Sequence, residues 1–159
     1  MKTIDKKGSI QKYEEFISFI ESLKNLDERK WASPIAENKW SVKNIIGHIM
    51  VWDKYMLEEA ILKIKTNQHV TIENLNIDDF NKKAVEYVKT KNKEDILNQT
   101  IHYRKEIIEN LTLLPEKKFF SNYTDNSGNN FAIYNYLEEF IEHDEHHKRQ
   151  IEQFLNSIN

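Results

Sequence analysis

Three of the six histidines fall within five residues near the end of the chain, in the stretch EHDEHHKRQ. Residues four apart on an α-helix differ by only about 40° in direction, so His143 and His147 are expected to share one face. His146 should point toward solvent. Two imidazoles one turn apart can ligate the same ion, because both rings reach a common point above the helix surface. The pattern predicts a metal-binding pair, and a polar helix edge is the alternative.

A reactive metal site needs a third ligand, and the remaining histidines are His48, His69 and His102. His102 projects away from the apolar stripe of its expected helix, and His69 lies in a polar loop and cannot be placed. His48 lies at the edge of an apolar helical face and is the best candidate, although alone it would fit a hydrogen-bonded histidine at the edge of the core. Three histidines leave a coordination position for water or substrate, as in catalytic zinc sites.

Two charged residues fall on faces that should be apolar. Asp144 lies on the inner face of the last helix, where a carboxylate is costly to bury unless it is paired. It could be a ligand, accept a hydrogen bond from a ligating histidine, act as a base, or pair with Lys148. Arg104 falls within the apolar arc of another helix, where its guanidinium could hold a carboxylate of a thiol or substrate. The alternative is that Arg104 reaches the rim or pairs with an acid at the core edge.

Composition narrows the class of protein. The 159 residues suit one domain, residues 1–159, with 39% hydrophobic and 31% charged residues, as in soluble globular proteins. The net charge of −3 does not indicate a nucleic-acid partner. No cysteine is present, so disulfides and thiolate ligands are excluded. No apolar run approaches the roughly 20 residues that cross a bilayer, and we expect a soluble cytoplasmic protein.

Apolar positions recur at helical spacing through most of the chain. They predict long helices over residues 9–26, 42–65, 93–114 and 131–154, with Ser9 and Ser41 as N-caps. A shorter helix is expected over residues 78–90, and loops over 66–76 and 121–130. No window indicates a run of strands. The expected fold is all-α: an up-down four-helix bundle with one additional short helix between long helices 2 and 3.

Two segments together resemble the DinB-like superfamily. WSVKNIIGHIMVWDKYM, residues 40–56, resembles the second helix of that family, where a Trp-Ser/Thr-x-x-x-x-x-x-His pattern supplies a metal ligand, here His48. EHDEHHKRQI, residues 142–151, resembles the last helix, where a His-x-x-x-His pair supplies two more, here His143 and His147. The order of the motifs and the length of the chain agree with the family.

The resemblance implies a divalent metal ion, zinc or nickel, held by three histidines with open positions. It further implies either a thiol-dependent transferase that uses a low-molecular-weight thiol such as bacillithiol, or a hydrolase that activates water, acting on a small electrophilic substrate. A metal-binding or stress-response protein without turnover is the alternative. A third hypothesis is a metal-free helical interaction module that forms a homodimer through exposed aromatic residues at Trp31, Tyr123, Tyr134 and Tyr136. The alternative is that these four side chains fill the core and its rim, where most aromatic residues lie.

Overall fold

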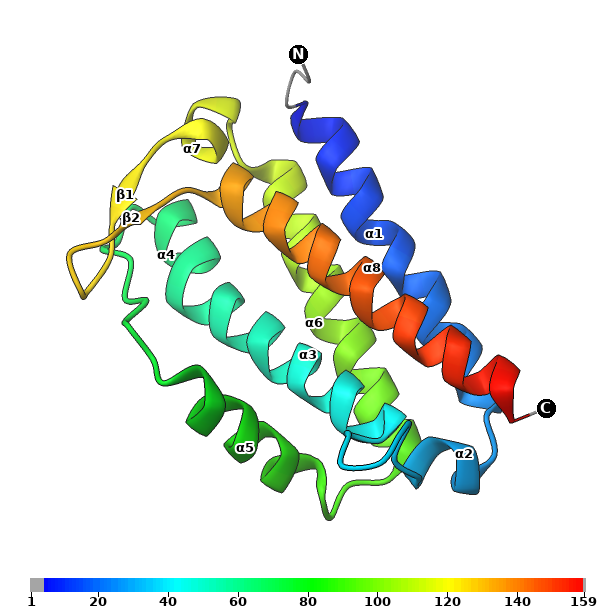
Figure 1. Cartoon of the computed structure of the whole chain (residues 1–159). Helices are drawn as coiled ribbons and strands as arrows, with labels where there is room; N and C mark the ends of the chain where they lie inside the picture. Colours follow the sequence, from blue (N-terminus) through cyan, green and yellow to red (C-terminus); the bar gives the residue numbers. More distant parts are fainter. Residues whose placement is uncertain (1–4, 159) are drawn as a thin grey trace.

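The computed structural model describes residues 5–158, and helices form most of it (Figure 1). The long helices are α1 (Lys6–Ser22), α3 (Val42–Met56), α6 (Lys93–Leu113) and α8 (Ile133–Ser157). They confirm the predicted helices, with ends shifted by a few residues. Helix α1 begins earlier than predicted, with Asp5 at the N-cap position, so Ser9 lies inside the helix and the prediction that it caps was wrong.

Helix α3 begins after an N-cap residue, Ser41, and is followed by a π-helical turn. The Ser41 hydroxyl accepts a hydrogen bond from the backbone N–H of Asn44 at 3.1 Å, as predicted for an N-cap. After α3, the chain continues through the π-helical segment η2 (Leu57–Ile61) and α4 (Leu62–Lys65). The predicted helix over residues 42–65 is therefore continuous, with one locally widened turn.

Short elements connect the long helices. They are the 3₁₀ segment η1 (Leu23–Asn25), α2 (Glu28–Ala32), α5 (Ile77–Val88), α7 (Glu116–Phe120), and the antiparallel strands β1 (Tyr123–Thr124) and β2 (Asn130–Phe131). Helix α5 confirms the predicted short helix. The α2 and α7 helices and the β1–β2 hairpin were not predicted, because elements of two to five residues are too short to show a hydrophobic period.

Helix α6 packs against both α1 and α3, and α1 also packs against α8. Helices α3 and α8 face each other across the remaining side of the bundle, where they have no extensive backbone interface (Figure 1). Helix α5 covers the outer side of α3 and returns the chain, so α3 and α6 run in the same direction (Figure 1). This arrangement leaves the space between α3 and α8 to side chains.

The core consists of two apolar clusters, one in each half of the bundle. Trp31 and Tyr136 belong to these clusters and are only 0% and 4% exposed, so these two fill the core, as in the alternative interpretation, and do not form an exposed aromatic surface. Tyr123 and Tyr134 are half-buried at the rim. Aromatic side chains bury more apolar area than any other type, and here they fill the core.

Within residues 5–158, no helix combines the length and the apolar character that crossing a bilayer requires.

Candidate metal centre

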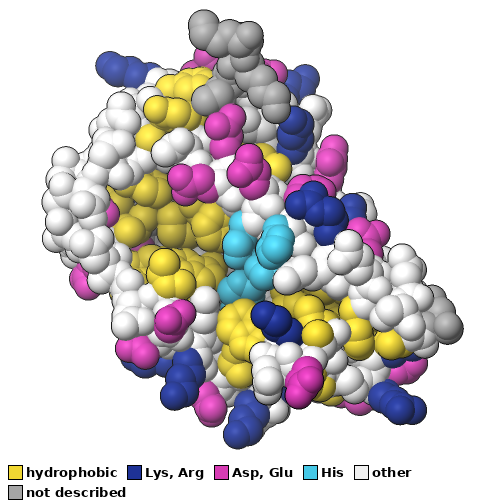
Figure 2. Space-filling view, viewed as in Figure 1, with side chains coloured by type: hydrophobic (Ala, Val, Ile, Leu, Met, Phe, Trp, Pro, Cys, Tyr) yellow, Lys and Arg dark blue, Asp and Glu magenta, His cyan; other side chains and the backbone are white. Residues whose placement is uncertain are grey.

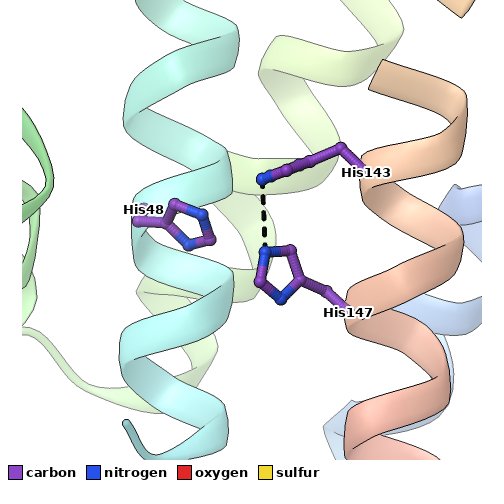
Figure 3. Close-up of side chains that lie close together, drawn as sticks. All are labelled: His48, His143 and His147. Atoms are coloured by element: carbon purple, nitrogen blue, oxygen red, sulfur yellow. Dashed lines mark hydrogen bonds between the residues drawn. The ribbon is translucent and has the colours of Figure 1, made fainter. Parts of the chain in front are cut away.

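The structure brings His48, His143 and His147 together in the space between α3 and α8 (Figure 3). One ring nitrogen from each residue lies within 4.8 Å of those of the other two. His48 projects from α3, whereas His143 and His147 project from successive turns of α8. The convergence that the sequence predicted is therefore present in the fold.

The ring of His48 is held from two sides. Its Nδ1 lies 2.5 Å from the carbonyl oxygen of Ile45, which can only accept, so Nδ1 carries the proton. The ring of Trp40 packs against it with centroids 4.9 Å apart. In neutral His48 the lone pair is consequently on Nε2, which is the form required of a metal ligand.

His147 is oriented in a similar way, because its Nδ1 lies 2.8 Å from Oε1 of Gln150. Its Nε2 lies 3.2 Å from Nε2 of His143, the dashed contact in Figure 3. Two ligands on one tetrahedral ion with bonds of about 2.0–2.1 Å would be about 3.3 Å apart. The two Nε2 atoms are therefore spaced nearly as a shared ion would need. In the metal-free protein, a proton between them makes the contact a hydrogen bond.

The three imidazoles are held neutral by their surroundings. Burial, reinforced by the neighbouring His147 and His143, lowers the pKa of His48 to about 3. Burial and the neighbouring histidines also lower the pKa of His143 to about 4, and burial lowers the pKa of His147. Nδ1 of His143 is buried without a hydrogen-bond partner in the described chain. A set of neutral nitrogen donors at this spacing fits a zinc-type ion.

The other histidines lie outside the cluster. His146 and His102 are exposed, as the helical periodicity predicted. His69, which the sequence could not place, is exposed in the loop after α4 and contacts Oδ1 of Asn126 through Nε2 at 2.9 Å.

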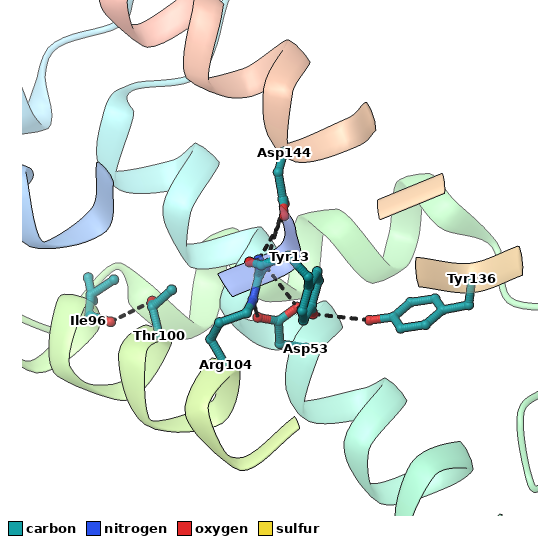
Figure 4. Close-up of polar contacts among 7 residues, drawn as sticks. All are labelled: Tyr13, Asp53, Ile96, Thr100, Arg104, Tyr136 and Asp144. Atoms are coloured by element: carbon teal, nitrogen blue, oxygen red, sulfur yellow. Dashed lines mark hydrogen bonds and ion pairs between the residues drawn. The ribbon is translucent and has the colours of Figure 1, made fainter. Parts of the chain in front are cut away.

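Asp144 is buried, and its side chain points toward Arg104 (Figure 4). Its Oδ2 accepts a hydrogen bond from Nη1 of Arg104 at 2.7 Å, and no ion pair joins it to Lys148 within residues 5–158. Burial raises the pKa of Asp144 to about 6, although the Arg104 guanidinium partly offsets this. Its role as a base or ligand stays a prediction, which this orientation does not favour.

Arg104 is 1% exposed, and its guanidinium is shared by two carboxylates. Nε donates to Oδ2 of Asp53 at 3.0 Å, opposite the contact with Asp144. This arrangement corresponds to the alternative of pairing with an acid near the core, and substrate binding by Arg104 stays a prediction without a contact to support it. Asp53 was missed by sequence reasoning, although its place on the α3 face lined by Ile45, Ile49 and Met56 was a signal.

Comparison with known proteins identifies the family of this histidine-bearing helical bundle. The model of the DinB superfamily matches residues 17–151. The chain belongs to the DinB superfamily. No curated protein matches the sequence.

Two solved structures share the DinB fold of this chain. One is YfiT from Bacillus subtilis, described as a probable metal-dependent hydrolase with an unusual four-helix bundle topology; at 15% identity it has a TM-score of 0.75, covering 99% of this chain and 90% of that one. The other is a mycothiol-dependent maleylpyruvate isomerase, with 12% identity and a TM-score of 0.68, covering 95% of this chain and 60% of that one. At these identities the likeness establishes the fold.

Histidine side chains are visible in the middle of one face of this DinB protein, beside a broad area of hydrophobic side chains (Figure 2). A succession of aromatic rings leads away from His143: Phe140 at 5.2 Å between centroids, then Tyr136 at 4.6 Å, then Phe131 at 6.3 Å. Phe140 and Phe131 are half-buried. A small molecule at the histidines would therefore meet apolar walls on this side.

Proposed function

We propose that the protein is a divalent-metal-dependent enzyme that acts on a small electrophilic molecule, with His48, His143 and His147 as ligands of a zinc or nickel ion. The observation that carries the proposal is the convergence of three imidazole nitrogens within 4.8 Å. The match to the DinB superfamily supports it. So does the shared fold with YfiT, which is described as metal-dependent.

An ion at this position would lower the pKa of a bound water or thiol and keep it nucleophilic near neutral pH. Side chains and backbone groups of the protein orient the ligands and line the site. The carbonyl of Ile45 fixes the tautomer of His48, and the amide of Gln150 holds the ring of His147 through Nδ1, which leaves Nε2 of both rings for the ion. The aromatic side chain of Phe140 beside His143 would offer an apolar wall to the substrate.

The nucleophile is proposed to be a low-molecular-weight thiol of the bacillithiol type, which would make the protein an S-transferase, or water, which would make it a hydrolase. Because the chain has no cysteine, a thiol would come from outside. The similarity in fold to a mycothiol-dependent isomerase favours a thiol. A cytoplasmic location, a homodimer and the lack of a nucleic-acid partner stay predictions.

A metal-binding or stress-response protein without turnover remains the alternative function. It would be favoured by a closed shell of four protein ligands, with Asp144 as the fourth. The carboxylate of Asp144 is instead engaged by Arg104. This orientation supports an open coordination position and therefore an enzyme.

Elemental analysis of purified, tag-free protein tests the proposal. We expect about one zinc or nickel ion per wild-type chain, and loss of the ion in His48→Ala, His143→Ala and His147→Ala. His146→Ala is the matched control, since this exposed histidine is in the same helix. Unchanged metal content in His147→Ala would refute the three-histidine site.

An activity assay distinguishes a thiol nucleophile from water. Metal-loaded protein is incubated with a model electrophile, once with bacillithiol and once without a thiol. Formation of the thioether only with bacillithiol indicates a transferase, whereas hydrolysis without it indicates a hydrolase. Stoichiometric metal with neither reaction across a panel of electrophiles would favour the binding protein without turnover.

A further inference from the structure

A second opening adjoins the histidine centre on the side of the loop before α3. It is a cavity of about 210 Å³ whose lining includes Lys39, Trp40, Ile45, His147 and Gln150. At roughly 30 Å³ per water molecule, its volume matches about seven waters. The cavity can therefore hold one end of a small molecule rather than a whole drug-sized ligand.

The loop that forms the outer wall is fixed by its own hydrogen bonds. The N–H of Ile35 donates to the carbonyl of Trp40 at 2.9 Å, and the N–H of Lys39 donates to the carbonyl of Ala36 at 3.1 Å. Asn38 has a φ of 60°, a left-handed conformation that asparagine tolerates in tight turns. Lys39 and Trp40 thus stand at a defined place beside the histidines, immediately before the N-cap of α3.

Lys39 is the lysine that lines this cavity, and its side chain is exposed. No ion pair joins it to a carboxylate in the described part of the chain, and Glu37 of the same turn does not line the cavity. Arg104, which lies in the core, is paired with Asp53 and Asp144. A negatively charged group that enters the cavity would find its counter-ion at Lys39.

The two sides of the centre are therefore lined differently. Aromatic side chains border His143, whereas a cation, an indole and an amide border His147. We propose that this cavity binds the carboxylate-bearing end of the small molecule whose sulfur or oxygen coordinates the ion, with Lys39 as the counter-ion and Trp40 as the apolar wall. The inference rests on the proposed function, because it assigns that molecule its orientation at the same centre.

The test compares thiols that differ in charge. Cobalt-loaded protein is titrated with 3-mercaptopropionate, 2-mercaptoethanol and cysteamine, and binding is followed by the sulfur-to-cobalt absorption. We expect wild type to prefer 3-mercaptopropionate. Lys39→Met should weaken the binding of 3-mercaptopropionate by only about three- to fivefold, because the lysine is exposed and solvent screens its attraction. Binding of 2-mercaptoethanol should not change, because this thiol has no carboxylate. Lys12→Met, which removes an exposed lysine of α1, is the control and should match wild type.

A second readout does not need the ion. Propionate is added to metal-free protein, and the indole N–H resonances of the three tryptophans are followed by NMR. We expect the Trp40 signal to shift in wild type and to shift much less in Lys39→Met, while Trp31 and Trp52 stay unchanged.

The two readouts keep the failures apart. Absence of bound metal would refute the proposed function. The shift of the Trp40 signal with propionate would still show whether the cavity binds a carboxylate. Metal and thiol binding with no preference for 3-mercaptopropionate, or a preference that Lys39→Met retains, would overturn this inference alone. Failure of propionate to shift Trp40 would also overturn it.

Discussion

At the scale of single residues, the lowered pKa values of the histidines link metal binding to stability. Burial and neighbouring histidines lower the pKa of His48 to about 3 and that of His143 to about 4, from an ordinary value of 6.5. Below pH 6.5 the unfolded chain binds protons that the folded chain does not. The contribution of these two histidines to the free energy of unfolding is therefore complete above about pH 6.5, and it is lost as the pH falls toward their folded-state pKa values. Asp144 has the opposite effect: its pKa is raised to about 6, so its contribution to the free energy of unfolding is lost as the pH rises.

Replacement of His48 isolates its share of this pH dependence. His48→Asn removes the titrating ring and keeps an N–H donor near the carbonyl of Ile45. Between about pH 7.5 and about pH 5, we expect the free energy of unfolding of metal-free protein to fall by about 1–2 kcal/mol less in His48→Asn than in wild type. Urea unfolding with a chelator present measures it. His146→Asn should behave like wild type, and equal slopes for wild type and His48→Asn would contradict the lowered pKa.

At the scale of the elements, one buried cluster of charged and polar side chains connects all four long helices (Figure 4). Arg104 of α6 lies between Asp53 of α3 and Asp144 of α8, and its guanidinium stacks 3.8 Å from the ring centroid of Tyr13 of α1. The Tyr13 hydroxyl donates to Oδ1 of Asp53 at 3.1 Å. The cluster lies within the core, and it ties α8 to α6 at Asp144, one residue away from His143.

Removal of the arginine should be costly, because it leaves two buried carboxylates without a counter-ion. For Arg104→Met we expect a loss of about 3–5 kcal/mol in the free energy of unfolding, measured by urea denaturation near neutral pH. Lys105→Met, at the exposed neighbouring position, should change it by less than about 0.5 kcal/mol. A loss below about 1 kcal/mol for Arg104→Met would show that the cluster does not hold the helices together.

The contact between α3 and α5 depends on a glycine. A Cβ at Gly47 would lie 2.7 Å and 2.8 Å from the two γ-carbons of Val88, closer than real side chains approach. We expect Gly47→Ala to lower the free energy of unfolding by about 1–3 kcal/mol. Thermal and urea unfolding measure this.

Two further variants control for the effect of alanine itself. Gly47→Ala should cost less in a Val88→Ala background, because the shortened side chain makes room. Gly8→Ala, at a helical position of α1 where the nearest atom is 3.3 Å away on the flexible side chain of Asp5, should be neutral or stabilising by up to about 1 kcal/mol. If Val88→Ala does not relieve Gly47→Ala, crowding is not the cause.

At the scale of the whole molecule, the proposed ion would join the one side of the bundle where two long helices lack an extensive backbone interface. Helices α3 and α8 meet there through His48, His143 and His147. An ion that binds only the folded chain stabilises it by about 2.7 kcal/mol at 100 times its Kd. For a chain of this size, that corresponds to a rise in Tm of roughly 5–10 °C.

Thermal unfolding with and without zinc checks this expectation. Zinc should raise the Tm of wild type and of His146→Ala, and it should leave the Tm of His147→Ala nearly unchanged. A similar rise in His147→Ala would mean that zinc binds elsewhere on the protein.

Much of the fold follows from patterns that are local in the sequence. The helical period of apolar residues predicted the four long helices and α5, and it placed His143 and His147 on one face with His146 outside. The short α2 and α7 helices and the β1–β2 hairpin carry too few residues for such a period and depend on the surfaces against which they pack.

The sequence by itself determined the helical class, the donor types and the faces on which they lie, because these depend on residues within one or two turns of each other. Only the tertiary structure decided that α3 and α8 face each other, so that His48 meets the pair on α8. It also decided that Arg104 pairs with both Asp144 and Asp53 in the core, while Lys39 lines the cavity without an ion pair to any carboxylate in residues 5–158. These outcomes depend on which distant helices pack together, since a buried charge takes whichever partner the packing brings near.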